Sequence, residues 1–265
     1  MRAAATLALL AFTAPPLLAR EPPAASDHAA FDTLLRTNVE NGMVDYDAFA
    51  QSSEFSGYLE WLADARFDDL EENERLALWI NAYNAYTIEL INAHDERDSI
   101  RNINKTLGLL KLKGPWRERL ARVGGVAYTL DEIEHEIIRK RFDEPRIHFA
   151  LVCAAMGCPP LRSEAYVGGQ LDAQLEEQAR RFILESPGKN RVDVERKTVH
   201  VSMIFRYYRT DFGGRDAAIG LYLAGFYATG PQRELLLSGR FRLHQTPYDW
   251  TLNSQEQALG LASRR

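Results

Sequence analysis

The sequence predicts a helix-rich α+β protein with a single globular domain over residues 27–255, in which a buried central helix packs on a small, mostly antiparallel sheet. Residues 76–93 are apolar almost all round, as expected of a helix enclosed by its own protein. Several other segments have apolar residues at helical spacing, and one segment alternates like a β-hairpin. A chain of 265 residues, 46% of them hydrophobic, is long enough to bury such a core.

The N-terminal segment has the pattern of a cleavable signal peptide. Arg2 is the only charge before Arg20, residues 3–18 are apolar apart from two threonines and a proline pair, and Ala19 is a small residue at the expected cut. The proline pair and the short length argue against a membrane anchor. We therefore expect a signal peptide at 1–19, a flexible leader at 20–26, and a periplasmic or secreted mature chain without a membrane span.

The central helix over residues 76–93 carries two polar exceptions, Asn81 and Asn84. Residues three apart are neighbours on a helix surface, so the two amides lie close together inside the core. A buried amide must be hydrogen-bonded, either by the backbone or by a ligand. Backbone bonding is the simpler interpretation, and ligand binding is the functional one. Amphipathic helices are expected around it, at residues 27–39, 55–62, 171–183, 204–208 and 217–228.

A second helix is expected to begin at Leu130, because Thr129 and Glu132 form the pattern of a capping box. Glu134 falls within the apolar stripe of this helix. A carboxylate there is costly unless it is paired or hydrogen-bonded, and Arg146 is an obvious partner, with Arg139 and Arg141 also near. A structural Glu134–Arg146 ion pair is one interpretation of this residue, and a catalytic carboxyl group is the other.

The remaining elements are predicted to be strands. Residues 147–153 form an apolar run interrupted only by His148, which suits a strand buried on both faces. Residues 192–201 alternate about a polar turn, which predicts a hairpin, and residues 241–244 form a further short strand. Residues 256–265 are expected to be a C-terminal tail.

Charge and motifs exclude several classes of function. The net charge is −5 and no basic tract is present, so a nucleic-acid partner is not expected. The sequence lacks a phosphate-binding loop, a dinucleotide-binding glycine turn, a serine-hydrolase elbow and a zinc-protease helix. We therefore predict no cofactor and no metal, and expect the partner to be a small molecule or a peptide.

Both cysteines lie in one short loop, at Cys153 and Cys158. They could form a disulfide, which an oxidising compartment permits. One of them could be a reactive thiolate, or both could bind zinc together with histidines. On a strand, an offset of five residues places His148 and Cys153 on opposite faces and about 16 Å apart. A base for Cys153 would then come from elsewhere, with His135 and His244 as candidates.

Asp249 lies between two aromatic residues near the end of the predicted domain, with Trp250 as its neighbour. A carboxylate in this place could orient a histidine, as the third member of a catalytic triad does. It could equally cap a turn, because aspartate side chains accept hydrogen bonds from the backbone two residues on.

Five blocks, in order, resemble the signature blocks of the domain-of-unknown-function 547 (DUF547) family. They are residues 78–85, 130–136, 146–153, 158–162 and 248–253. The resemblance covers about residues 30–255, and together with the predicted signal peptide it leads us to expect an exported bacterial member of this family. It implies a cysteine, a histidine, buried asparagines and a terminal Asp-Trp block similar in kind to those of papain-like and transglutaminase-like thiol enzymes. Those folds carry the nucleophile on the central helix, where this chain has Asn81 and no cysteine.

Two functions follow as hypotheses. The first is a thiol-dependent acyl-transfer or hydrolytic enzyme acting on peptides or peptide-like thiol compounds. Its nucleophile would be Cys153 or Cys158 and its base His148 or His135, oriented by Asp249 or Glu134. The second is a non-catalytic binding module with a structural Cys153–Cys158 disulfide. In either case the residues expected to contact the ligand are Asn81, Asn84, Arg146 and Trp250.

Overall fold

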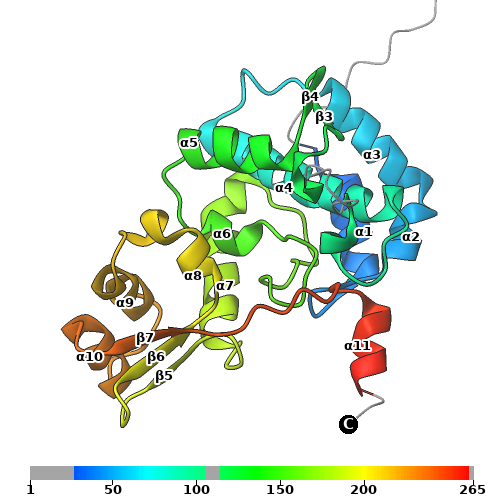
Figure 1. The fold of residues 1–265 in the computed structure, drawn as a ribbon. Helices are drawn as coiled ribbons and strands as arrows, with labels where there is room; N and C mark the ends of the chain where they lie inside the picture. Colours follow the sequence, from blue (N-terminus) through cyan, green and yellow to red (C-terminus); the bar gives the residue numbers. More distant parts are fainter. Residues whose placement is uncertain (1–26, 105–113, 263–265) are drawn as a thin grey trace, which may run out of the picture.

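The structure is a computed structural model that describes residues 27–104 and 114–262 (Figure 1). The predicted signal peptide at 1–19 and the leader at 20–26 lie outside the described residues. The helix-rich α+β architecture predicted from the sequence is confirmed. In the described ranges, no helix is long and apolar enough to cross a membrane.

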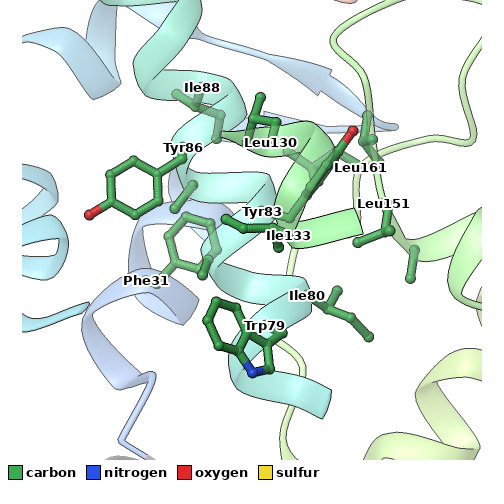
Figure 2. Close-up of a cluster of buried hydrophobic side chains, with 14 of the residues drawn as sticks. Phe31, Trp79, Ile80, Tyr83, Tyr86, Ile88, Leu130, Ile133, Leu151 and Leu161 are labelled. Carbon is green, nitrogen blue, oxygen red and sulfur yellow. The ribbon is translucent and has the colours of Figure 1, made fainter. Parts of the chain in front are cut away.

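The first half of the fold surrounds a central helix, α4 (Glu72–Ala93). Its N-terminus forms a capping box between Glu71 and Glu74, and fifteen of its residues are buried, as its nearly uniform apolar surface predicts. Figure 2 shows Trp79, Ile80 and Tyr83 of this helix within a cluster of buried hydrophobic side chains. The elements before it are α1 (Ala29–Asn38), β1 (Val39–Glu40), β2 (Met43–Val44), α2 (Tyr46–Ala50) and α3 (Ser53–Asp64).

The central helix α4 contacts β3 (Ala121–Val123), which forms an antiparallel hairpin with β4 (Val126–Tyr128). The rest of the helix packs on other helical segments, among them α2, α3 and α7 (Leu171–Leu184). Short 3-10 turns complete this half: η1 (Ile100–Asn102), η2 (Pro115–Arg117) and η4 (Gly168–Gln170).

The second half of the fold has its own hydrophobic cluster. Its sheet has the order β5-β6-β7, antiparallel between the first two strands and parallel between the last two, so the predicted hairpin and final strand are confirmed. Its strands and helices are β5 (Arg191–Asp193), β6 (Thr198–Val201), α8 (Ile204–Tyr207), η5 (Arg209–Phe212), α9 (Asp216–Ala224), α10 (Pro231–Ser238) and β7 (Arg242–Gln245).

After β7 the chain runs back across the molecule (Figure 1). Ser254 bridges to Val44 of β2, and the helix α11 (Gln255–Ala262) follows, within the segment predicted as a tail. This return places residues 248–250 between the two halves, where Tyr248 packs against both hydrophobic clusters. The terminal block of the sequence therefore joins the two halves of the fold.

The prediction of a strand over residues 147–153 is wrong. Residues 147–150 form a helical turn, α6 (Ile147–Ala150), and the chain then continues without regular pairing. A short apolar run fits a buried helical turn as well as a buried strand, so periodicity cannot separate the two. In place of a neighbouring strand, the side chain of Asn84 bonds the backbone here: it donates to the Ala150 carbonyl and accepts from the Val152 N–H, both at 3.0 Å.

The helix that carries Glu134 begins at Leu130, as predicted, with Thr129 and Glu132 bonded reciprocally at 2.9 and 3.0 Å. Its central part, η3 (Glu132–Ile138), is a π-helix, and the helix ends in α5 (Arg139–Arg141). The Arg139 N–H bonds to the Glu134 carbonyl, five residues back. Short π-helical segments are rare and occur frequently at functional sites. This one carries Glu134 and His135 to the cavity described next.

Candidate functional site

A cavity of about 210 Å³ lies between the two halves of the fold. Its walls come from α4, the π-helical segment, α6, α8 and the C-terminal segment that follows β7. Its aromatic lining residues are Tyr83, Trp116, Tyr207, Tyr208, Tyr248 and Trp250. Small-molecule sites commonly enclose about 300–1,000 Å³. This cavity is smaller, so it fits one side chain or a small organic group.

One wall of the cavity is a continuous row of rings. The ring centres of Trp116 and Trp250 are 6.0 Å apart, those of Trp250 and Tyr248 4.6 Å, and those of Tyr248 and Tyr207 5.9 Å. These separations are typical of edge-to-face and tilted aromatic pairs, which hold one another in place. Trp250, predicted as a ligand-contacting residue, therefore lines the cavity in a fixed orientation.

Glu134 also lines the cavity, with only 6% of its surface exposed. The hydroxyls of Tyr208 and Tyr83 donate to its carboxylate, and His135 Nδ1 lies 3.9 Å from Glu134 Oε1. Burial raises the pKa of Glu134, against the opposing effect of these partners. The predicted Glu134–Arg146 pair is wrong. Arg146 bonds instead to Glu144 and Asp172, at 2.6 and 2.7 Å.

His148 shares the cavity with Glu134 and is buried. Its Nε2 lies 2.7 Å from Asp211 Oδ2, and both carboxylate oxygens of Asp211 also accept from Arg139 at 2.7 Å. Arg139 holds the pKa of Asp211 well below its usual range, so the carboxylate only accepts and Nε2 must carry the hydrogen. Desolvation lowers the pKa of His148 to about 4, although Asp211 opposes the shift. The ring is therefore neutral at pH 7.

The second ring nitrogen of His148, Nδ1, is buried without a hydrogen-bond partner among the residues that the structure describes. In the neutral ring it is an acceptor. The imidazole is fixed on its other side by stacking on Tyr208, with ring centres 3.8 Å apart. The cavity is thus lined by His148, whose Nδ1 is a buried acceptor without a partner in the described ranges, and by a buried carboxyl group, Glu134. The prediction that His148 and Cys153 lie on opposite faces assumed a strand and is wrong, because the strand is absent and both residues line this cavity.

Cys153 and Cys158 form a disulfide, one of the three interpretations that the sequence left open. Cys153 lines the cavity, whereas Cys158 is buried, with 1% of its surface exposed. The hydroxyl of Tyr248 lies 3.0 Å from Cys153 Sγ and donates to Cys158 Sγ at 3.2 Å. The loop between the cysteines is held by backbone bonds from Met156 and Gly157 to the carbonyls of Thr251 and Asp249.

The asparagines lie outside this cavity, with their amides bonded by backbone, as the simpler interpretation held. Asn81 donates to the Tyr166 carbonyl at 2.8 Å and accepts from the Tyr166 N–H at 2.9 Å. Asn84 bonds the segment after α6 in the same way. Both asparagines therefore hold backbone segments of the fold in place, and neither contacts the cavity.

Two other residues expected at the site, Asp249 and His244, do not line the cavity. Asp249 accepts from the Thr251 N–H at 2.9 Å, so it caps a turn, and the carboxylate that contacts a cavity histidine is Asp211. His244 lies on β7, stacked on His200, and is exposed. His135 does line the cavity. Sequence reasoning missed Asp211, Tyr83, Tyr208 and Tyr248.

In the described ranges, no group of three histidine, cysteine, aspartate or glutamate side chains could hold a metal ion. Residues 67–183 match the model of a family described as "Protein of unknown function, DUF547". This segment of the chain belongs to the DUF547 family. The matched segment contains α4, the π-helical segment, His148 and both cysteines. Residues from 204–208 and 248–250, which lie outside the matched segment, complete the cavity. No curated protein and no solved structure matches the chain.

The buried carboxyl group gives a testable pH dependence. Because folding raises the pKa of Glu134, its protonated form contributes stability below the unfolded pKa, and this contribution is lost as the pH rises through the folded pKa. Glu134→Gln mimics the protonated group at every pH. Urea unfolding from pH 4.5 upward should therefore show the variant gaining on the wild type as the pH rises. Glu136→Gln, at a 58% exposed side chain, is the control. Parallel curves for wild type and Glu134→Gln would contradict this assignment.

Proposed function

We propose that this DUF547 protein binds a small molecule, or one residue of a peptide-like ligand, in the aromatic cavity, with the Cys153–Cys158 disulfide fixing one wall. The observation that carries the proposal is the pairing of the aromatic wall with two buried polar side chains, Glu134 and His148, and the Nδ1 atom of His148 has no hydrogen-bond partner in the described ranges. Ligand sites are typically apolar with a few converging polar groups that orient the ligand. An unpartnered acceptor buried in such a place lacks a donor, which a ligand N–H or O–H would supply.

The thiol-dependent acyl-transfer or hydrolytic activity is the second candidate. It is favoured by the sharing of one cavity between Cys153 and a histidine that Asp211 orients, since a nucleophile, a base and an orienting carboxylate are the parts such enzymes need. The disulfide masks this nucleophile, so the activity would require reduced protein. Binding needs no such step, and we therefore place it first. Export to an oxidising compartment is part of the same proposal, because a disulfide persists there.

The binding proposal is tested with a library of tripeptides Ala-X-Ala, using saturation transfer from protein to peptide in NMR. We expect a subset of the library to bind wild-type protein. Trp250→Ala should weaken that binding by about 30-fold, because truncating an aromatic residue at the centre of an interface costs about 2 kcal/mol. Trp61→Ala is the matched control: Trp61 is also partly buried, and it packs against His28 and Tyr58 outside the cavity.

The outcome against the proposal is equally definite. If no tripeptide receives saturation from the wild type, or if Trp250→Ala and Trp61→Ala bind alike while both remain folded, the cavity is not the binding site. Thermal unfolding of both variants shows whether they remain folded.

A further inference from the structure

The two cysteines differ in their access to solvent and in their hydrogen bonds. Cys153 lines the aromatic cavity and Cys158 is buried beside it. The Cys153 N–H donates to Cys158 Sγ at 3.1 Å, and the Tyr248 hydroxyl, which lies 3.0 Å from Cys153 Sγ, is also within donating distance of Cys158 Sγ, at 3.2 Å. Burial raises the pKa of Tyr248, which keeps this hydroxyl protonated and able to donate. Cys153 therefore borders the cavity, whereas Cys158 Sγ is buried and accepts a backbone hydrogen bond.

A sulfur with two hydrogen-bond donors is prepared to carry negative charge, because hydrogen bonds to the charged form stabilise a thiolate. A cationic group lies close to the same residue: Lys189 Nζ donates to the Cys158 carbonyl at 2.5 Å. Burial lowers the pKa of Lys189 to about 8, so the amine is still largely protonated at pH 7. These hydrogen bonds and the nearby amine favour the Cys158 thiolate, against the opposing effect of its burial. In thiol–disulfide exchange the sulfur of the more stable thiolate is the better leaving group.

We propose that the Cys153–Cys158 disulfide exchanges with thiol compounds that enter the aromatic cavity, with Cys153 as the attacked sulfur and Cys158 as the leaving and resolving sulfur. This inference rests on the proposed function and names its ligand class as small or peptide-borne thiols. The ligand thiolate forms a new S–S bond to Cys153 Sγ, the Cys153–Cys158 bond breaks, and the electron pair leaves with Cys158 Sγ. The proton that the ligand thiol lost ends on Cys158 Sγ or in solvent, so atoms and electrons balance.

The reverse step gives Cys158 its second role. Its thiolate attacks Cys153 Sγ, reforms the protein disulfide and expels the ligand thiol. A second ligand thiol that instead attacks the ligand sulfur of the mixed disulfide leaves oxidised ligand and reduced protein. A further cavity, of about 310 Å³, lies beside Cys158 and Lys189. Attack on Cys158 from that side is the competing route, and the test below separates the two.

The first experiment compares the two sulfurs in single-cysteine variants. Cys158→Ser and Cys153→Ser are each incubated with the disulfide dimer of Ala-Cys-Ala and analysed by intact mass. We expect the tripeptide adduct on Cys153 to form at least tenfold faster than on Cys158. The same proteins in denaturant should react alike, because access is then equal. Faster labelling of Cys158, or no adduct on folded Cys153, overturns the proposal.

The second experiment tests, in oxidised full-length protein, whether the Tyr248 hydroxyl stabilises Cys158 as the leaving group. Ala-Cys-Ala is added, samples are quenched with acid, and the initial rate of loss of the protein disulfide is followed by mass. Tyr248→Phe should slow this rate about tenfold, the effect of losing one hydrogen bond to a charged group. Tyr222→Phe is the control, since that hydroxyl has no hydrogen-bond partner within residues 27–104 and 114–262. Equal rates for wild type and Tyr248→Phe overturn the role assigned to Tyr248.

The two proposals fail separately. If Ala-X-Ala peptides bind but Ala-Cys-Ala forms no adduct, only the exchange step is lost. If Ala-Cys-Ala exchanges at a rate that Trp250→Ala leaves unchanged, and no library member binds, the ligand-binding proposal is lost.

Discussion

Asn84→Ala is expected to lower the free energy of unfolding by about 4 kcal/mol, the largest loss that we predict for a single substitution. The side chain is buried in the middle of α4 and makes two hydrogen bonds, to the Ala150 carbonyl and the Val152 N–H. Leaving a buried donor or acceptor unsatisfied costs about 1–3 kcal/mol, and alanine leaves two of them, together with a small void. Urea denaturation at pH 7 measures the effect.

The same helix provides the matched control. Asn92 also lies on α4, but neither polar atom of its side chain is hydrogen-bonded to any residue that the structure describes. Asn92→Ala removes polar atoms without partners and introduces a better helix former, so its unfolding free energy should stay within about 1 kcal/mol of wild type. If Asn84→Ala and Asn92→Ala destabilise equally, the backbone bonds of Asn84 do not stabilise the fold as we argue.

Asn84 also shows how far the sequence could predict the fold. The apolar pattern predicted α4, and the spacing of the two asparagines showed that polar groups meet inside the core. A pattern could not show what those amides bond. Asn84 takes the place of a strand neighbour for residues 150–152, and this is one reason why the predicted strand is absent. Tertiary bonding decided between two local structures that the apolar run fits equally well.

The sequence also predicts part of the candidate site. The sequence indicates Glu134, because a carboxylate in an apolar stripe violates the helix pattern, and it indicates Trp250 and Cys153 through unusual blocks of sequence. Asp211 has no such local signal. It lies in the short turn η5, 63 residues from His148, and it is one of 37 acidic residues in the chain. A buried histidine does predict that some partner exists, but only the fold selects which one.

The ion pair and hydrogen bond of Asp211 are the basis of the second prediction of a large loss of stability. Asp211→Asn is expected to lower the free energy of unfolding by about 2–3 kcal/mol at pH 7. The substitution keeps the shape of the side chain but removes the charge that pairs with Arg139 and accepts from His148. Breaking a buried ion pair costs about 3–5 kcal/mol. Because the Asp211 side chain is 24% exposed, solvent screening reduces that figure.

The Arg209–Asp216 pair supplies the comparison for Asp211. It has the same 2.7 Å separation, but the Asp216 side chain is 52% exposed. Asp216→Asn should therefore cost less than about 1 kcal/mol, the usual value of a surface ion pair. Urea unfolding in low and high salt separates the two, since salt weakens the exposed pair more than the partly buried one. If Asp211→Asn is as mild as Asp216→Asn, the Arg139–Asp211–His148 chain does not fix the imidazole. The oriented acceptor in the cavity would then have no structural basis.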